Sequence, residues 1–199
     1  MQIDVSDVFE QSCADLIQKP VDQPATSELN RVLPQLRQEW ANAGPELLGA
    51  ASQVTGRPYR FRETRAIVFA CPGLPSMSSP LLINGRFYLQ SVTPNPEPPS
   101  LFAGILFHEV LHRYIHDILN ERPDRTTPLL QKYREEPAVV RSHLHLFALQ
   151  SAVYQRLHRE TELARILAFE RKLKAAPVFA RAHAIVDAEG ATAFLRELQ

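Results

Sequence analysis

Two histidines and one glutamate lie within five residues of one another, in the sequence HEVLH at residues 108–112. This run sits inside a strongly apolar segment, residues 100–120. On a helix, His108 and His112 would share one face about one turn apart, so both imidazoles could bind one metal ion. Glu109 would lie on the same side and reach a water molecule bound to that metal. The spacing therefore predicts two ligands of a zinc site together with a general base.

The segment around this motif has the composition of a buried helix. Ser100 follows a proline-rich loop and is expected to cap the helix at its N-terminus. Residues 101–107 are apolar around the whole circumference apart from one glycine, which is typical of a helix inside the protein. The polar side chains of residues 108–117 then occupy one half of the helix, where the preceding turn is apolar. We expect these polar groups to line a cleft.

The stretch resembles the active-site helix of the zincin superfamily of metallopeptidases. The resemblance covers the HEVLH core, the helix around it and, more loosely, the strand-rich segment that precedes it. It implies an α+β, zincin-like fold that is mostly helical, with a small sheet or hairpin before the HExxH helix. It also implies Zn²⁺ as the cofactor and a peptide or protein as the substrate.

A catalytic zinc site normally has three protein ligands and a water molecule, so one ligand is still missing. His116 is rejected because about 12 Å of helix rise separates it from His108. Metzincins turn the chain with a glycine between their second and third ligands, and residues 113–115 contain none. The gluzincin branch takes its third ligand as a glutamate from a following helix, which directs attention to Glu135 and Glu136.

The length of the connection favours a later residue. If the helix that carries HEVLH ends near Leu119, the metal lies about nine residues before that end. An antiparallel helix that begins at Pro137 would come alongside the metal after about nine residues, near residue 146. This favours His143 or His145. A helix that begins at Pro128 would instead place Glu135 or Glu136 alongside the metal. The proline at position 137 argues against one continuous helix through that point.

Helical position separates the two histidines. His143 shares a mostly apolar side with Phe147, whereas His145 points with two arginines, which indicates solvent. Glu136 would lie on the side of His143, either as its hydrogen-bond partner or as the true ligand. We predict that His108, His112 and His143 bind the metal. Glu136, Glu135 and His145 remain the alternatives for the third ligand.

The elements before the motif are predicted from periodicity and from turn residues. A helix capped by Ser6 is expected over residues 5–18, and an amphipathic helix over residues 27–43, broken or bent near Pro34. Another short helix is expected from Pro45 to Gly56. A strand is predicted in residues 59–70. The Asn-Gly pair at residues 84–85 predicts a hairpin between strands 81–83 and 86–89.

Beyond the motif the pattern is helical. A turn is expected over residues 121–127, a short helix over 128–134 and a long apolar helix over 138–157, with Pro137 at its first position. Amphipathic helices punctuated by Pro177 and Gly190 are expected from residue 160 to residue 199. His158 and His183 are interpreted as surface or packing residues.

The chain as a whole is expected to form one zincin-like domain, residues 1–199. Within it we distinguish a helical part (1–57), a small sheet (58–99), the metal-site helices (100–157) and C-terminal helices (158–199). Lys and Arg together number 22, as do Asp and Glu, which argues against a nucleic-acid or anionic-membrane partner. No apolar run is long enough to span a bilayer. The sequence does not determine the oligomeric state.

The start of the chain shows no signal peptide, which predicts a cytoplasmic protein, or a periplasmic or secreted one if a leader was removed. Cys13 and Cys71 could pair in an oxidising compartment. Two cysteines do not decide between these compartments.

The function predicted from these residues is zinc-dependent hydrolysis, with a small metallopeptidase favoured. Zinc-bound water would attack the substrate carbonyl, with Glu109 as its general base. Tyr154, Arg113 or His145 could stabilise the oxyanion. One alternative is a non-catalytic, zincin-like, metal-stabilised binding module, against which the presence of Glu109 argues. Another is hydrolysis of a non-peptide amide.

Overall fold

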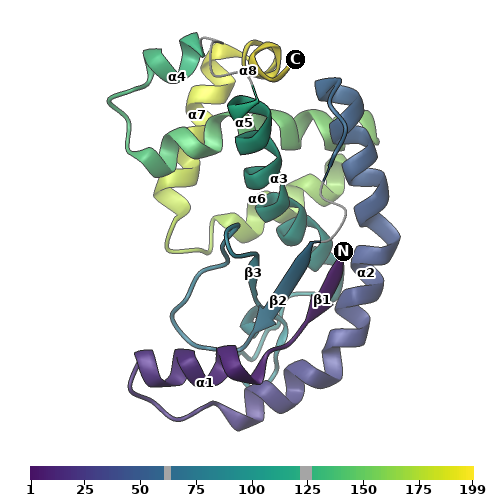
Figure 1. Cartoon of the computed structure of the whole chain (residues 1–199), viewed down its shortest axis with the longest axis vertical. Coiled ribbons are helices and arrows are strands. Elements are labelled where there is room, and N and C mark those ends of the chain that lie inside the picture. Colours follow the sequence, from purple (N-terminus) through teal and green to yellow (C-terminus); the bar gives the residue numbers. More distant parts are fainter. Residues whose placement is uncertain (61–63, 122–126) are drawn as a thin grey trace. The chain divides into compact units, whose positions relative to one another are not determined.

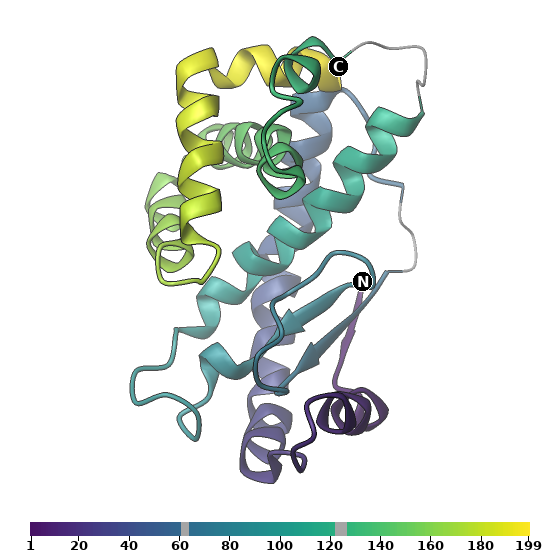
Figure 2. The same ribbon diagram turned by 90° about the vertical axis from the view of Figure 1, so that its left-hand side faces the viewer.

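The structure is a computed structural model that describes residues 1–60, 64–121 and 127–199. Helices dominate and a small three-stranded sheet accompanies them, so the fold is α+β (Figures 1 and 2). Two compact units are distinguished: residues 1–44 with 60–109, and residues 45–59 with 110–199. The prediction of a single domain is not tested by this division and stays a prediction. In the described residues, no helix has both the length and the apolar character needed to cross a bilayer.

The sheet of the first unit is parallel throughout. Its strands β1 (Gln2–Asp4), β2 (Arg65–Phe69) and β3 (Leu82–Asn84) lie in that order. The strand predicted in residues 59–70 is thus present over residues 65–69, and residues 61–63 lie outside the described part. Helix α1 (Asp7–Leu16) begins as predicted, because the Ser6 hydroxyl accepts the backbone N–H of Phe9.

The hairpin predicted around Asn84 and Gly85 is wrong. Strand β3 pairs in parallel with β2, and the chain then enters the 3-10 helix η1 (Arg86–Tyr88). Gly85 has a φ of −81°, which is not the positive φ of a type I′ turn. It is needed for a different reason, since a Cβ there would lie 2.7 Å from Leu29 and 2.9 Å from Val68. The Asn-Gly pair therefore marks close packing instead of a hairpin turn.

Helix α2 (Gln23–Thr55) corrects a second prediction, because the two separate helices expected over residues 27–43 and 45–56 form one continuous helix that contains Pro34 and Pro45. The Asp22 carboxylate accepts the N–H of Ala25 at its start. A proline inside a helix removes one hydrogen bond and costs about 3 kcal/mol. Burial of the helix's apolar side chains offsets this cost. These buried residues are Leu29, Leu33, Leu36, Trp40 and Leu47.

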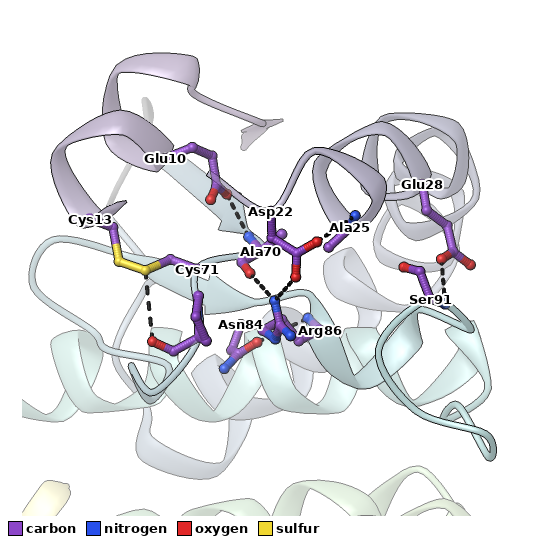
Figure 3. A network of polar contacts seen from close by, with 11 residues as sticks. Glu10, Cys13, Asp22, Ala25, Glu28, Ala70, Cys71, Asn84, Arg86 and Ser91 are labelled. Carbon is purple, nitrogen blue, oxygen red and sulfur yellow. Dashed lines mark hydrogen bonds and ion pairs between the residues drawn. A yellow bond between two sulfur atoms is a disulfide. The ribbon is translucent and has the colours of Figure 1, made fainter. Parts of the chain in front are cut away.

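A polar network and a disulfide join α1 to the ends of β2 and β3 (Figure 3). Cys13 and Cys71 form the disulfide, with their Cα atoms 6.2 Å apart. The buried Glu10 carboxylate accepts the backbone N–H of Ala70 at 2.5 Å. Arg86 donates to the Ala70 carbonyl at 2.7 Å (Figure 3). The carboxyl end of β2 is therefore held by both covalent and polar contacts.

Helix α3 (Phe102–Asn120) contains the HExxH motif and follows the predicted range closely. It is preceded by the 3-10 helix η2 (Pro99–Leu101), so Ser100 lies inside a tighter turn and is not the N-cap. Residues 101–111 are buried, as the apolar circumference predicts.

The second unit is built around helix α5 (Ala138–Arg156). Helices α6 (Glu160–Glu170), α7 (Ala176–Glu189) and α8 (Ala191–Leu198) pack against it. The short helix α4 (Pro128–Lys132) precedes it. These helices match the predicted ones, although Pro137 caps α5 instead of occupying its first helical position. Of the turn predicted at residues 121–127, residues 122–126 lie outside the described part.

Candidate metal centre

Helix α3 presents the motif as its spacing requires. His108 and His112 are one turn apart on an unbroken helix, with Glu109 next to the first of them. His108 is 8% exposed and Glu109 is 9% exposed, while His112 is half-buried. A buried imidazole and a buried carboxylate, with a second, half-buried imidazole beside them, need polar or metal partners, because burial without them is unfavourable.

The third histidine comes from α5. One ring nitrogen each of His108, His112 and His143 lies within 4.8 Å of the other two. The rings of His112 and His143 meet edge to face, with centroids 4.7 Å apart and an interplanar angle of 87°. Nitrogens that share a tetrahedral zinc ion at about 2.0–2.1 Å are roughly 3.3 Å apart. A small side-chain adjustment would therefore bring these nitrogens to zinc geometry.

The backbone of α5 orients His143. Its Nδ1 is 2.6 Å from the carbonyl oxygen of Val139, one turn earlier. Since a carbonyl only accepts, Nδ1 carries the proton and the lone pair is on Nε2. A histidine that binds a metal usually donates its other ring N–H in this way. The sequence predicted such an acceptor but favoured Glu136. The Val139 carbonyl takes that place, and a backbone group leaves no signal in the side-chain pattern.

Aromatic rings from α5 itself and from α7 pack against His143. Its ring centroid is 5.3 Å from that of Phe147 and 4.9 Å from that of Phe179. The ring of His183 stacks on that of Phe147, with centroids 3.8 Å apart and an interplanar angle of 12°, and its Nε2 is 3.3 Å from a carboxylate oxygen of Glu170. His183 therefore packs, as predicted. The role of Phe179 was missed, because nothing in the sequence relates its position on α7 to His143.

Burial sets the protonation states around the cluster. It raises the pKa of Glu109 to about 8. Burial, with the neighbouring His143, lowers the pKa of His112 to about 3, and burial also lowers the pKa of His143. Both imidazoles are therefore neutral near pH 7, which is the form that binds metals. A divalent cation in the same place would favour the charged carboxylate of Glu109.

The two glutamates considered as third ligands are engaged elsewhere. Glu136 pairs with Arg181, whose Nε donates to it at 3.0 Å, and the guanidinium lowers the pKa of that carboxyl. Glu135 is exposed and accepts from Arg134 at 3.0 Å. Within the described residues, neither belongs to the histidine cluster.

The prediction that His145 faces solvent is wrong. Its side chain is 2% exposed, and its Nε2 is 2.8 Å from the Glu197 carboxylate of α8. Phe194 of the same helix meets its ring edge to face. The helical position relative to two arginines was misleading because α8, which covers this side of α5, comes about 50 residues later in the chain. His145 is a packing histidine with a carboxylate partner.

The remaining polar candidates fall into two groups. His116 is exposed and lies within hydrogen-bond distance of Asn120, in agreement with its rejection as a ligand. Tyr154 is fully buried, and burial raises the pKa of its hydroxyl, which therefore stays protonated and able to donate. Arg113 is half-buried on α3. Of these three, Arg113, next to His112 on α3, stays a candidate for oxyanion stabilisation, since His145 is held by Glu197 and Tyr154 lies about 16 Å further along α5 than His143.

Comparisons with known proteins add no relative to this picture. No protein-family model matches the chain. Searches of curated proteins and of solved structures also find no match. The interpretation of the site therefore rests on its own residues and geometry.

Proposed function

We propose that this protein is a zincin-like, zinc-dependent hydrolase, and specifically a small metallopeptidase. The observation that carries the proposal is the cluster of ring nitrogens of His108, His112 and His143, within 4.8 Å of one another, next to the carboxylate-bearing Glu109 of α3. Three imidazole nitrogen donors suit zinc, and a fourth position for water or substrate would make the site catalytic. A histidine as third ligand departs from the gluzincin pattern.

The order of elements supports a zincin-like fold as part of the same proposal. A small sheet precedes the HExxH helix, and the third ligand comes from a later helix in the chain. The sheet is parallel and lacks the expected hairpin. The proposal therefore rests more on the two helices that carry the histidines than on the strands.

The mechanism assigns each step to a residue of the chain. When bound, zinc would polarise the substrate carbonyl and lower the pKa of a bound water molecule. Glu109 accepts the proton of the attacking water and passes it to the leaving amine. The Val139 carbonyl fixes the His143 ring, so that the ligand does not rotate between substrates. Arg113, next to His112 on α3, donates to the oxyanion.

Replacement of Glu109 by glutamine tests this function. Glu109→Gln should bind about one zinc per chain, as wild type does, yet hydrolyse no peptide, because an amide cannot accept the proton of water. The assay is elemental analysis of the purified protein together with mass spectrometry of a pool of synthetic peptides. Equal turnover by the variant would exclude the general-base role. A wild-type protein that binds no zinc would exclude the whole proposal.

Burial favours one competing function, a non-catalytic metal-stabilised binding module. His108 and His143 are each less than 10% exposed, as in many structural metal sites. Such a site has no need of a carboxylate beside its first ligand. The peptide pool separates the two functions, since a binding module that holds zinc would leave every peptide intact.

A further inference from the structure

A pocket of about 490 Å³ opens between strand β1 and helix α2 in the first unit. Its polar wall contains Asp4 of β1, Arg65 of β2 and Arg37 of α2, and none of these belongs to the histidine cluster. The side chains of Arg37 and Arg65 are 48% and 61% exposed, so a ligand can reach them from solvent. A concave surface with a few convergent polar groups is typical of a ligand site.

Asp4 holds both arginines in place. Its two carboxylate oxygens accept from Arg37 Nη2 at 2.9 Å and from Arg65 Nε at 3.1 Å. Arg37 Nε also donates to the carbonyl of Ile3 at 2.6 Å, so this guanidinium is fixed at two points. A guanidinium group has five N–H donors, and these bonds use only a minority of them. The other donors of both arginines are left for a second acceptor.

The charges in this pocket do not balance. In the part of the chain that the structure describes, Asp4 is the only carboxylate within ion-pair distance of Arg37 or Arg65. Two guanidinium groups and one carboxylate leave one positive charge. A carboxylate ligand carries one negative charge and matches the planar fork of arginine, so it would neutralise the pocket. A phosphate dianion would instead leave an excess of negative charge.

Helix α2 adds a hydrogen-bond acceptor and an apolar wall. Pro34 has no N–H, so the carbonyl of Asn30 lacks the donor that an α-helix normally gives it. Asn30 and Pro34 both line the pocket, so this carbonyl lies at its wall. Leu33, Pro34 and Val5 supply apolar surface beside it. The pocket therefore offers cations, an acceptor and an apolar side.

We propose that this pocket binds the C-terminal residue of a peptide, with its carboxylate on Arg37 and Arg65. Such a residue carries a carboxylate, an amide N–H and a side chain on one carbon atom, and these match the three parts of the pocket. The N–H donates to the Asn30 carbonyl, and an apolar side chain packs against Leu33 and Pro34. The pocket is open to solvent, which leaves room for the rest of the peptide. Such binding needs no metal ion and is independent of the proposed hydrolase function.

Isothermal titration calorimetry of the full-length protein at low ionic strength tests the site with three small probes. N-acetyl-leucine has the carboxylate, the N–H and an apolar side chain. N-acetyl-leucinamide lacks the negative charge, and 4-methylpentanoate lacks the N–H. N-acetyl-leucine should bind most tightly. The amide should bind roughly 10- to 100-fold more weakly, because charge-assisted hydrogen bonds to both arginines are lost, and 4-methylpentanoate should be intermediate.

Substitutions locate the binding. Arg37→Gln and Arg65→Gln should each weaken the binding of N-acetyl-leucine about tenfold or more. Arg31→Gln is the matched control, because Arg31 is exposed on α2 and does not line the pocket, and it should bind as wild type does. Binding should persist in His108→Ala, which excludes coordination of the probe by a metal ion at the histidine cluster. Arg65 is the more exposed of the two arginines, so Arg65→Gln keeps the test open if Arg37→Gln fails to fold.

Four outcomes would overturn the inference. If N-acetyl-leucine does not bind, or binds no better than its amide, the pocket is no carboxylate site. Unchanged binding in Arg65→Gln would place the probe elsewhere. If inorganic phosphate binds more tightly than N-acetyl-leucine, the ligand is a phosphate group. Pentaglycyl-leucine, checked for integrity by mass spectrometry, should bind at least as tightly as N-acetyl-leucine; binding more than about tenfold weaker would mean that the pocket takes a free acylated amino acid. None of these results bears on zinc binding or on Glu109.

Discussion

The assignment of His143 as third ligand makes the sharpest prediction. Its ring nitrogen lies within 4.8 Å of those of His108 and His112, and a backbone carbonyl orients the ring. Structural zinc sites bind with about 10–16 kcal/mol over four ligands, or about 2.5–4 kcal/mol for each. Since about 1.4 kcal/mol is a factor of ten, His143→Ala should weaken zinc binding by roughly two to three orders of magnitude.

The assay is competition with a chromophoric zinc chelator at fixed pH, with circular dichroism to check that the variant is folded. His116→Ala is the control on α3, because that side chain is exposed and outside the cluster. Its zinc affinity should equal that of wild type. His183→Ala removes an imidazole that stacks on Phe147 without belonging to the cluster, and it should change zinc affinity far less than His143→Ala.

A comparison of Glu136→Ala with His143→Ala could refute the assignment of His143 as third ligand. Because the carboxylate of Glu136 pairs with Arg181, Glu136→Ala should leave zinc affinity close to that of wild type. If Glu136→Ala strips the metal while His143→Ala keeps it, the third ligand is the glutamate. The reasoning from the geometry of α5 would then be wrong, and the site would be that of an ordinary gluzincin.

Three further predictions concern stability. Glu197→Ala leaves the buried His145 without its carboxylate partner, so the free energy of unfolding in urea should fall by about 1–3 kcal/mol, and an unchanged value would refute the pairing. Gly85→Ala should lower it by about 1–3 kcal/mol, because the added Cβ meets side chains of α2 and β2 at less than 3 Å; an equally stable variant would show that the packing yields. Arg86 lowers the pKa of Asp22 below its usual 3.8, so this carboxylate adds stability above that pH and loses it as the pH falls through the lowered value. In Asp22→Asn the melting temperature should therefore fall less steeply than in wild type as the pH is lowered from 6 to 2. An identical fall in both proteins would contradict the pairing of Asp22 with Arg86.

The helices that carry the histidines were predictable because their signals are local. The HExxH spacing, the apolar run before it and Pro137 all act within a few residues of the elements they define. The residue of α5 that lies alongside the metal follows from the helix rise and from the length of the connection after Leu119. His143 was therefore within reach of the sequence, although its orientation by a backbone carbonyl was not.

The errors in the part of the chain before the motif come from interactions that are distant in sequence. An Asn-Gly pair is a strong hairpin signal, but strand β3 pairs with β2 in parallel, and that choice depends on residues far from the turn. Likewise, Pro34 and Pro45 are helix breakers by local rules. They are tolerated in α2 because the apolar side chains around them are buried, which only the folded chain reveals.

The two histidines of α5 show how the fold decides between equal sequence signals. His143 and His145 are two residues apart, so they point to nearly opposite sides of the helix, and both are buried. Glu197 accounts for the burial of His145, since a carboxylate held at 2.8 Å is a sufficient partner for an imidazole. His143 instead meets a carbonyl, two aromatic rings and two further histidines. The Val139 carbonyl accepts the proton on Nδ1 of His143, and the other nitrogen of this ring lies in a cluster with those of His108 and His112. That arrangement suits a metal ion better than any other partner, and it explains why a histidine of α5, and not a glutamate before it, completes the proposed site.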